Sequence, residues 1–301
     1  MIYAIIDIGS NTIRMAVYKV QSDNLEMLIK KKYTVGLAAY IENQCMSPAG
    51  IDKACTVLNK FKAFLHNFKI DNVSAFATAA LRNIKNSETA VKEISERTGL
   101  QIKVISGEEE ARFDFISVIK SMQVSEGLIV DIGGASTEIV IYKNKVIEKS
   151  VSLPIGSLNM YIKNVADIIP SQREALIINK LVLNALSDIS LPKGKGLIIC
   201  GIGGSFKAMW QLNCHMMTNN IDSKEVSLDN LSAILNNFLI DNISLNKALE
   251  TLIDAVPERV KTVIPGMLIA QAIANYFNSS NIIYSDSGVR EGYLYDMMQT
   301  K

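Results

Sequence analysis

Two acidic turns stand out among the residues of this 301-residue chain that could do chemistry. Asp7 ends an apolar run and precedes Ile-Gly and a polar turn, and Asp131 has the same place in LIVDIGGASTEIVIY at 128–142. A structural hairpin normally places Asn-Gly or Asp-Gly directly between its strands, whereas here the acid comes before the turn. Glycine lets the backbone approach a ligand, successive N–H groups bind phosphate oxygens, and a nearby carboxylate can hold Mg²⁺. The two turns therefore predict phosphate and metal binding.

The two turns belong to one repeated pattern. IIDIGSNTIRMAVY at 5–18 matches 128–142 almost element for element, and a third glycine turn, GIGGS at 201–205, also follows a strand-like run. The distance between the two copies is too long for a solenoid repeat and favours a duplicated domain. Because the chain is also long for one hydrophobic core, we expect an N-terminal domain at 1–121 and a C-terminal domain at 122–301.

Strand-like and helix-like segments alternate around these turns, which predicts an α/β fold. Apolar residues from Ile51 to Phe68 form one helical face, and Gly99 is a typical helix end. Further strands are expected at 72–80, 102–107 and 281–286. Helices are expected at about 51–69, 87–98, 108–120, 171–188, 205–217, 228–240, 245–254 and 258–277, and from 288 onward.

Composition excludes several classes of protein. The formal net charge of +1 gives no overall field that would attract nucleic acid or an anionic membrane. No apolar run reaches about 18 residues without charge, so we expect no membrane span. The four cysteines form no C-x-x-C pair and only two histidines are present, which leaves too few ligands for a zinc site. We expect a cytoplasmic protein.

Further motifs give the chain a family resemblance. In order along the chain it resembles the exopolyphosphatase and guanosine pentaphosphate phosphatase family (Ppx/GppA), within the actin-like, sugar-kinase and heat-shock ATPase superfamily. The resemblance implies two ribonuclease-H-like (actin-like ATPase) domains, an active-site cleft between them, and a last helix that packs back on the first domain. The motifs are DIGSNTIR at 7–14, ATAALRNIKN at 77–86, GLQIKVISGEEEARF at 99–113, DIGGASTE at 131–138, GIGGS at 201–205 and SDSGVREG at 285–292.

The resemblance implies hydrolysis of a phosphoanhydride. We expect Mg²⁺-dependent release of terminal orthophosphate from inorganic polyphosphate, and conversion of pppGpp to ppGpp as a second activity. Two alternatives stay open: a phosphotransferase between polyphosphate and ADP, and a sensor that binds (p)ppGpp with little turnover. A monovalent cation such as K⁺ is a second candidate cofactor. A homodimer is an open expectation for the assembly.

The resemblance also assigns roles to individual residues. Glu109 is the expected catalytic base, with Glu110 second, although an acidic run could simply favour a helix N-terminus. Asp131 and Glu138 are the expected metal-associated carboxylates, and Asp7 mirrors Asp131 from the first domain. The expected phosphate-binding residues are Gly9, Ser10, Asn11, Arg82, Gly133, Gly134, Ser136, Thr137, Gly203, Gly204, Ser205 and Arg259.

Some residues depart from the family pattern or keep a structural interpretation. Ala135 stands where relatives usually carry a third glycine, which could narrow the phosphate-binding turn. Arg290 in GVREG is expected to be structural, and the basic run of Lys30, Lys31 and Lys32 is expected to be a solvated strand end. The Ala135 change puts the preference for substrate length in question and leaves the fold unaffected.

Overall fold

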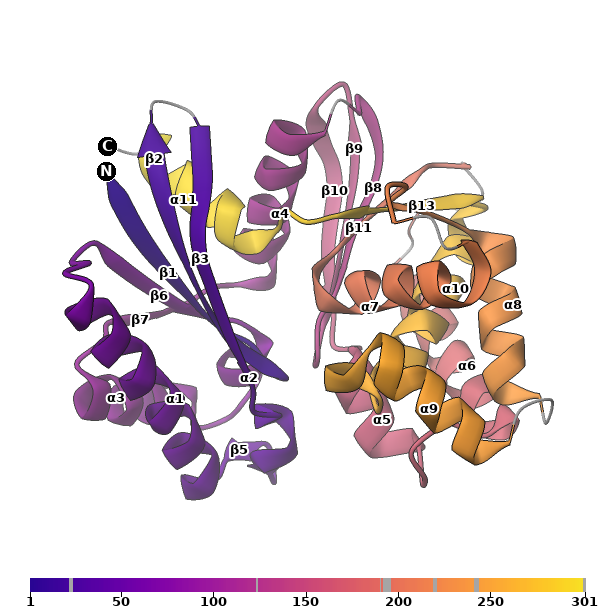
Figure 1. Cartoon of the computed structure of the whole chain (residues 1–301), viewed down its shortest axis with the longest axis horizontal. Helices are drawn as coiled ribbons and strands as arrows, with labels where there is room; N and C mark the ends of the chain where they lie inside the picture. Colours follow the sequence, from indigo (N-terminus) through magenta and orange to yellow (C-terminus); the bar gives the residue numbers. More distant parts are fainter. Residues whose placement is uncertain are drawn as a thin grey trace. The chain divides into compact units, whose positions relative to one another are not determined.

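The computed structural model describes residues 1–21, 24–122, 124–189, 191, 196–218, 221–240 and 244–299. The chain forms two compact units, shown in Figure 1. Unit 1 consists of Met1–Ile116 together with Val289–Lys301, and unit 2 consists of Ser117–Gly288. We expected the domain boundary between residues 121 and 122. In the structure the two units divide between Ile116 and Ser117, inside a helix. The last helix belongs to unit 1.

Unit 1 is built on a five-stranded mixed sheet of order β3-β2-β1-β6-β7. β1 (Ile2–Ile8) and β2 (Thr12–Gln21) form the hairpin that carries the first acidic turn, and β3 (Asn24–Thr34) extends it antiparallel at the edge. β6 (Val73–Ala77) and β7 (Ile102–Val104) lie parallel to β1 on its other side. β1 is therefore a central strand.

Helices cover both faces of this sheet, because β1 is apolar on both sides. Ile6 belongs to a buried cluster with residues of α1 (Pro48–Asn67) and α3 (Ser87–Thr98). Adjacent residues along a strand point to opposite faces of the sheet. Accordingly, Ile5 packs in a second cluster with Phe113 of α4 and Leu294 of α11.

The two helices on this second face come from distant parts of the sequence. α4 spans Gly107–Ser121 and α11 spans Val289–Gln299. A Cβ atom on Gly292 of α11 would lie 1.7 Å from the backbone oxygen of Phe113 in α4, so only glycine permits this approach. Arg112 and Asp296 join the same helices through two hydrogen bonds of 2.7 and 2.9 Å.

Unit 2 contains a six-stranded sheet of order β10-β9-β8-β11-β13-β12. β8 and β9 form the second acidic hairpin, and β8, β11 and β13 run parallel. The helix α10 is buried at almost every position and packs against α6, α7 and α8. The strands are β8 (Glu126–Ile132), β9 (Thr137–Lys143), β10 (Val146–Leu153), β11 (Ile199–Ile202), β12 (Glu225–Ser227) and β13 (Asn281–Ser285).

Most helices of unit 2 follow the expected pattern, although the helix at 157–164 was not expected. They are α5 (Ser157–Asn164), α6 (Gln172–Asp188), α7 (Gly203–Asn213), a π-helical turn (Cys214–Thr218), α8 (Leu228–Leu239), α9 (Leu245–Ala255), a 3₁₀ turn (Pro257–Arg259) and α10 (Val263–Phe277). The short elements of unit 1 are a 3₁₀ turn (Leu37–Tyr40), β4 (Ile41–Glu42), β5 (Cys45–Met46) and α2 (Ala79–Arg82).

The elements of the structure differ from the expected ones in several places. The helix predicted at 258–277 begins only at Val263, because Pro265 lacks an N–H and its ring would clash with a carbonyl of a preceding turn. The strand predicted at 72–80 ends at Ala77, where the good helix formers of α2 take over. β10 was not predicted. In the structure it follows β9 through a two-residue hairpin turn, in which Asn144 and Lys145 both have positive φ.

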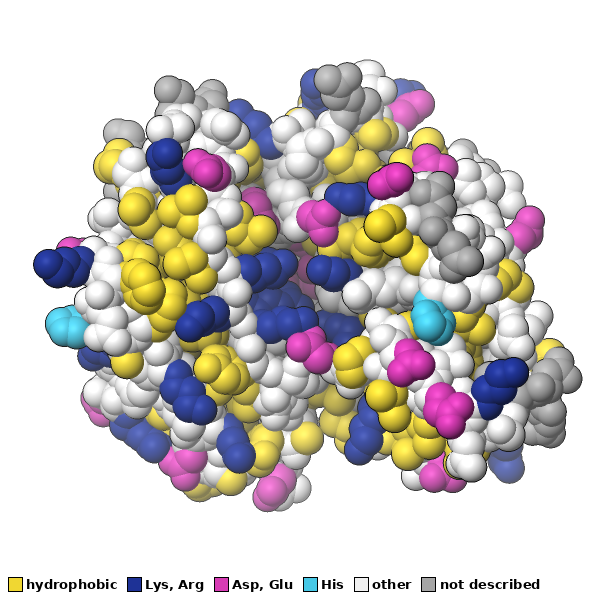
Figure 2. Space-filling view, in the orientation of Figure 1, with side chains coloured by type: hydrophobic (Ala, Val, Ile, Leu, Met, Phe, Trp, Pro, Cys, Tyr) yellow, Lys and Arg dark blue, Asp and Glu magenta, His cyan; other side chains and the backbone are white. Residues whose placement is uncertain are grey.

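The outer strand β3 is largely exposed and carries a basic run. Lys30, Lys31 and Lys32 lie on it, and the Lys31 ammonium sits 3.8 Å from the centre of the Phe64 ring. Figure 2 shows Lys and Arg side chains in dark blue among hydrophobic side chains over this part of unit 1. Lysines on an edge strand discourage pairing with other chains.

No helix among the described residues has the length and apolar content needed to cross a membrane.

Candidate phosphate and metal site

The two acidic turns have the same backbone geometry. In unit 1 the Gly9 N–H donates to the Thr12 oxygen at 3.2 Å, and in unit 2 the Gly133 N–H donates to the Ser136 oxygen at 2.9 Å. Each turn connects two antiparallel strands and is preceded by Asp-Ile. The duplicated pattern in the sequence is therefore a duplicated hairpin in the structure.

The residue opposite the acid differs between the two hairpins. Asp7 of β1 is directly opposed by Arg14 of β2, and Arg14 Nη1 lies 3.4 Å from Asp7 Oδ2. Asp131 of β8 is directly opposed by Glu138 of β9. Directly opposed residues of an antiparallel pair share one face of the sheet. Unit 1 thus presents an ion pair at the position where unit 2 presents two carboxylates.

Asp7 is buried among arginines. Its side chain is almost fully buried, and so is the side chain of Arg290 from GVREG. Burial raises the pKa of Asp7 above its ordinary value, although the positive charges of Arg14 and Arg290 act in the opposite direction. These arginines balance the charge of Asp7 inside unit 1. The environment suits a structural carboxylate better than a metal ligand, which leaves Asp131 and Glu138 as the candidate pair.

The first residue of α7 lies directly against the Asp131 carboxylate. Gly203, the first residue of α7, has φ of +80°, and a Cβ atom there would lie 2.5 Å from Asp131 Oδ1. A side chain at this position would therefore be strained and would displace the carboxylate. A helix N-terminus carries unpaired N–H groups and a partial positive charge, so it favours anions.

Arg259 packs on the next glycine of the same turn. A Cβ atom on Gly204 would lie 1.9 Å from Arg259 Nη2 and 2.5 Å from its Cζ. The guanidinium thus lies directly against the first turn of α7. Arginine binds two phosphate oxygens with its planar fork. An acid, a helix N-terminus and a guanidinium therefore meet around Gly203 and Gly204 within unit 2.

Two of the predicted phosphate-binding hydroxyls are committed to the backbone. Thr137 Oγ1 donates to the Ile155 oxygen at 2.6 Å, and Ser205 Oγ donates to the Ile132 oxygen at 2.7 Å. Both side chains are buried. These hydroxyls support the turn, and its backbone N–H groups are better candidates for contact with phosphate.

A segment that sequence reasoning did not assign to the site holds the turn of unit 2 in place. The Ser157 N–H donates to the Gly133 oxygen at 2.9 Å. A Cβ atom on Gly156 would lie 2.4 Å from the Ala135 nitrogen, so this approach requires glycine. The signal that could have found the segment is the tripeptide Ile-Gly-Ser at 155–157, which repeats the one in the first turn.

The predicted metal ligands Asp131 and Glu138 form a pair without further acids nearby. Throughout the described part of the chain, no three His, Cys, Asp or Glu side chains gather into a group that could hold a metal ion. Mg²⁺ is commonly held by one or two carboxylates, waters and substrate phosphates. Two facing carboxylates beside a phosphate-binding turn fit that kind of site.

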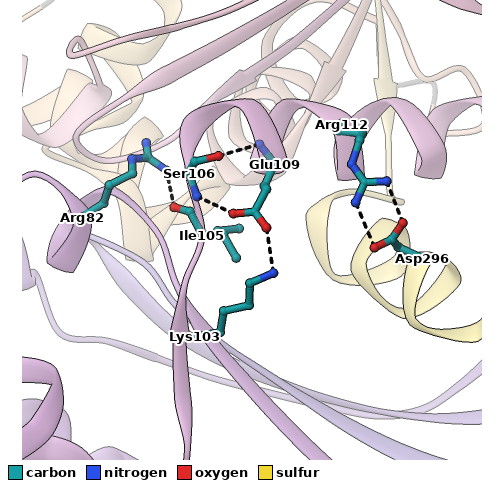
Figure 3. A network of polar contacts seen from close by, with 7 residues as sticks. All are labelled: Arg82, Lys103, Ile105, Ser106, Glu109, Arg112 and Asp296. Atoms are coloured by element: carbon teal, nitrogen blue, oxygen red, sulfur yellow. Dashed lines mark hydrogen bonds and ion pairs between the residues drawn. The ribbon is translucent and has the colours of Figure 1, made fainter. Parts of the chain in front are cut away.

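The predicted base Glu109 caps the N-terminus of α4, as Figure 3 shows. The Ser106 N–H donates to Glu109 Oε2 at 2.9 Å, and the Glu109 N–H donates to Ser106 Oγ at 3.0 Å, which is a capping box. Lys103 Nζ also donates to Glu109 Oε1 at 2.7 Å. Partial burial alone would raise the pKa of Glu109, but the hydrogen bonds from Lys103 and Ser106 outweigh it and lower the pKa.

Glu110 has a different environment from its neighbour. It is buried, and Arg82 Nη1 donates to its Oε2 at 2.7 Å. The same Arg82 nitrogen donates to the Ile105 oxygen at 3.2 Å, which ties the end of α2 to the start of α4. Glu110 therefore forms a buried ion pair with a predicted phosphate-binding arginine, whereas Glu109 caps the helix and contacts Lys103.

The chain is similar to known proteins along nearly its whole length. The chain is 27% identical over 99% of its length to a bifunctional 3-dehydroquinate synthase/phosphatase of Fusobacterium nucleatum, of which it spans 47%. It is 25% identical over 98% of its length to a Haemophilus influenzae protein provisionally named an exopolyphosphatase, of which it spans 90%. It is 27% identical over 99% of its length to a guanosine-5'-triphosphate,3'-diphosphate pyrophosphatase of Pseudoalteromonas atlantica, of which it spans 59%.

The chain therefore spans about half the length of the first of these relatives, and less than two thirds of the third. A crystal structure of the Aquifex aeolicus member of the Ppx/GppA family superposes with a TM-score of 0.79 at 25% identity, covering 100% of this chain and 98% of the other. This similarity confirms the predicted α/β fold of the actin-like ATPase class. The model of the Ppx/GppA phosphatase family matches residues 16–301, and the chain belongs to this family.

Proposed function

We propose that this protein hydrolyses terminal phosphoanhydride bonds, releasing orthophosphate from inorganic polyphosphate, with pppGpp as a second substrate. One observation carries the proposal: the Asp131 carboxylate and the Arg259 guanidinium both lie against the first two residues of α7. A metal-binding acid and a phosphate-binding cation around one helix N-terminus suit a substrate that combines phosphate with Mg²⁺. Relatives named for exopolyphosphatase and guanosine pentaphosphate activity support the substrate class.

The residues of unit 2 divide the work of binding. The N–H groups of residues 134–136 and of the start of α7 would donate to phosphate oxygens, and Arg259 would hold a further phosphoryl group. Asp131 and Glu138 would hold Mg²⁺, which supplies neutralisation of the phosphoryl charge. A monovalent cation remains a prediction with no assigned site.

The residues of unit 1 supply the proton chemistry in this proposal. Glu110 would orient the attacking water and accept its proton, and Arg82 would hold the Glu110 carboxylate and a phosphate oxygen together. Arginine has five N–H donors, so one guanidinium can serve two acidic groups. Glu109, the first choice from the sequence, would stabilise the start of α4.

The two alternative activities make distinct demands. A phosphotransferase would return the phosphoryl group to ADP, and a sensor would bind nucleotide without turnover. The presence of both Glu110 and the Asp131–Glu138 pair favours hydrolysis over sensing. A cytoplasmic location and the absence of a nucleic-acid partner stay predictions.

The test is orthophosphate release with Mg²⁺ from short polyphosphate, long polyphosphate and pppGpp, each with and without ADP. Release that does not need ADP and that is lost in E110Q would support the hydrolase. ATP formed from ADP would replace it with the phosphotransferase. Tight nucleotide binding without any release would replace it with the sensor.

We also propose that two copies of the chain associate through α6. Its outer face exposes Leu176 by 67%, Ile177 by 42% and Leu181 by 39%. Arg173 and Asp188 lie at opposite ends of this face, and neither forms an ion pair within the described residues. Two α6 helices packed antiparallel about a two-fold axis at their midpoint would set each Arg173 against the partner's Asp188. This charge complementarity favours a second copy as the occupant of the face.

A further inference from the structure

A row of polar residues crosses three strands of the unit 2 sheet. Asp131 of β8 opposes Glu138 of β9, and Glu138 opposes Ser152 of β10. Directly opposed residues share one face of an antiparallel sheet, so the three side chains lie side by side. Ser152 Oγ donates a hydrogen bond to Glu138 Oε1 at 2.7 Å.

We propose that Ser152 is a positioning residue, which orients the Glu138 carboxylate toward Asp131 for a divalent cation. The inference rests on the metal role given to these two acids in the proposed function. A glutamate side chain has several rotatable bonds, and a hydrogen bond to one oxygen fixes the direction of the other. Partners of metal ligands commonly act in this way.

Burial makes the bond from Ser152 hard to replace. Glu138 is 2% exposed, whereas Ser152 itself lies at an exposed position of β10. A water molecule that replaced the serine hydroxyl would not be fixed by the strand, so it would not hold the carboxylate in one direction. A buried carboxylate that loses a donor also loses orientation.

The chemistry of the donor also distinguishes this row from its counterpart in unit 1. There Asp7 is opposed by an arginine, which balances its charge. Ser152 contributes a neutral hydroxyl to Glu138, which orients the carboxylate without adding a charge. An oriented carboxylate that keeps its charge beside a second carboxylate is what a divalent cation requires.

The test compares S152A with S152T, which keeps the hydroxyl, and with the control S150A. Ser150 lies on the same strand and opposes Val140, so its loss should not affect Glu138. Mn²⁺ is titrated into each full-length protein without substrate, and the free ion is followed by electron paramagnetic resonance. S152A should bind Mn²⁺ about 10-fold more weakly than wild type, while S152T and S150A stay within about 2-fold.

A second readout separates positioning from a general loss of structure. In S152A the Mg²⁺ concentration for half-maximal phosphate release should rise about 10-fold, while kcat at saturating Mg²⁺ stays within about 2-fold. Equal Mn²⁺ affinity in S152A and wild type would overturn the inference, as would a wild type that binds no Mn²⁺. A wild type that binds Mn²⁺ but releases no phosphate would count against the proposed function. The Mn²⁺ titration of the variants would then decide by itself whether Ser152 positions Glu138.

Discussion

Arg82 and Glu110 are joined by a hydrogen bond of 2.7 Å that links the end of α2 to the first turn of α4. This contact gives two adjacent glutamates different surroundings. Glu110 is buried beside a candidate phosphate-binding arginine, whereas Glu109 faces Lys103 and caps the helix. The following predictions test this and the other relationships within each unit.

Replacement of the two glutamates by glutamine should have unequal effects. E110Q should lower kcat by about 10³-fold, because it removes the proposed proton acceptor. E109Q should keep activity within about 5-fold, since glutamine can also serve in a capping box. Phosphate release under saturating substrate measures both. An inactive E109Q beside an active E110Q would return the catalytic role to Glu109.

The stability of the protein in acid should depend on Glu109. Its pKa in the folded state lies below the ordinary value of 4.5, so the ionised carboxylate stabilises the fold above that pH. This contribution is lost as the pH falls through the folded pKa. Urea unfolding at several pH values should therefore show a shallower acid decline in E109Q than in wild type. Identical declines would mean that the contacts with Lys103 and Ser106 contribute nothing.

Arg14 should stabilise unit 1 through Asp7. R14Q removes one partner of a buried ion pair and should lower the free energy of unfolding by about 3 kcal/mol. D7N/R14Q should be more stable than R14Q, because the buried carboxylate that has lost one of its two arginines is then absent. Chemical denaturation of the four proteins in this cycle measures the coupling. Strictly additive effects would show that the two side chains do not interact.

The glycine at position 204 should be required for the placement of Arg259. G204A places a methyl group where Arg259 Nη2 lies, so the guanidinium must move. KM for polyphosphate should rise about 10-fold, in line with the loss of a phosphate contact worth about 1.4 kcal/mol. The double variant G204A/R259A should be no worse than R259A alone. A clear further loss in the double variant would assign G204A an effect independent of Arg259.

Charge reversal should test the proposed contact between two α6 helices. R173D and D188R should each be monomeric, because each sets like charges against one another in both symmetric contacts. An equimolar mixture should form a heterodimer, in which both contacts again join opposite charges. Sedimentation of the single variants and of the mixture measures this. A monomeric wild type, or a mixture that stays monomeric, would remove α6 as the interface.

Local sequence patterns were sufficient for the framework of the site. The repeated Asp-Ile-Gly pattern predicts both hairpins, and alternation of strands and helices predicts the α/β fold, because hydrophobic periodicity and glycine turns act over short stretches of chain. The positions of Asp131 and Glu138 on either side of one turn also follow from such a pattern. Hairpin pairing then sets them opposite each other.

The division of labour between similar residues was decided by tertiary structure. Whether Glu109 or Glu110 faces Arg82 and whether the Ser205 hydroxyl donates to the backbone both depend on contacts with distant segments. The segment at 155–157 reaches the turn only through the fold of unit 2. The amino-acid sequence by itself determined which groups are available for chemistry. Packing decided which of them are already engaged, because hydrogen bonds and burial depend on neighbours that local patterns do not specify.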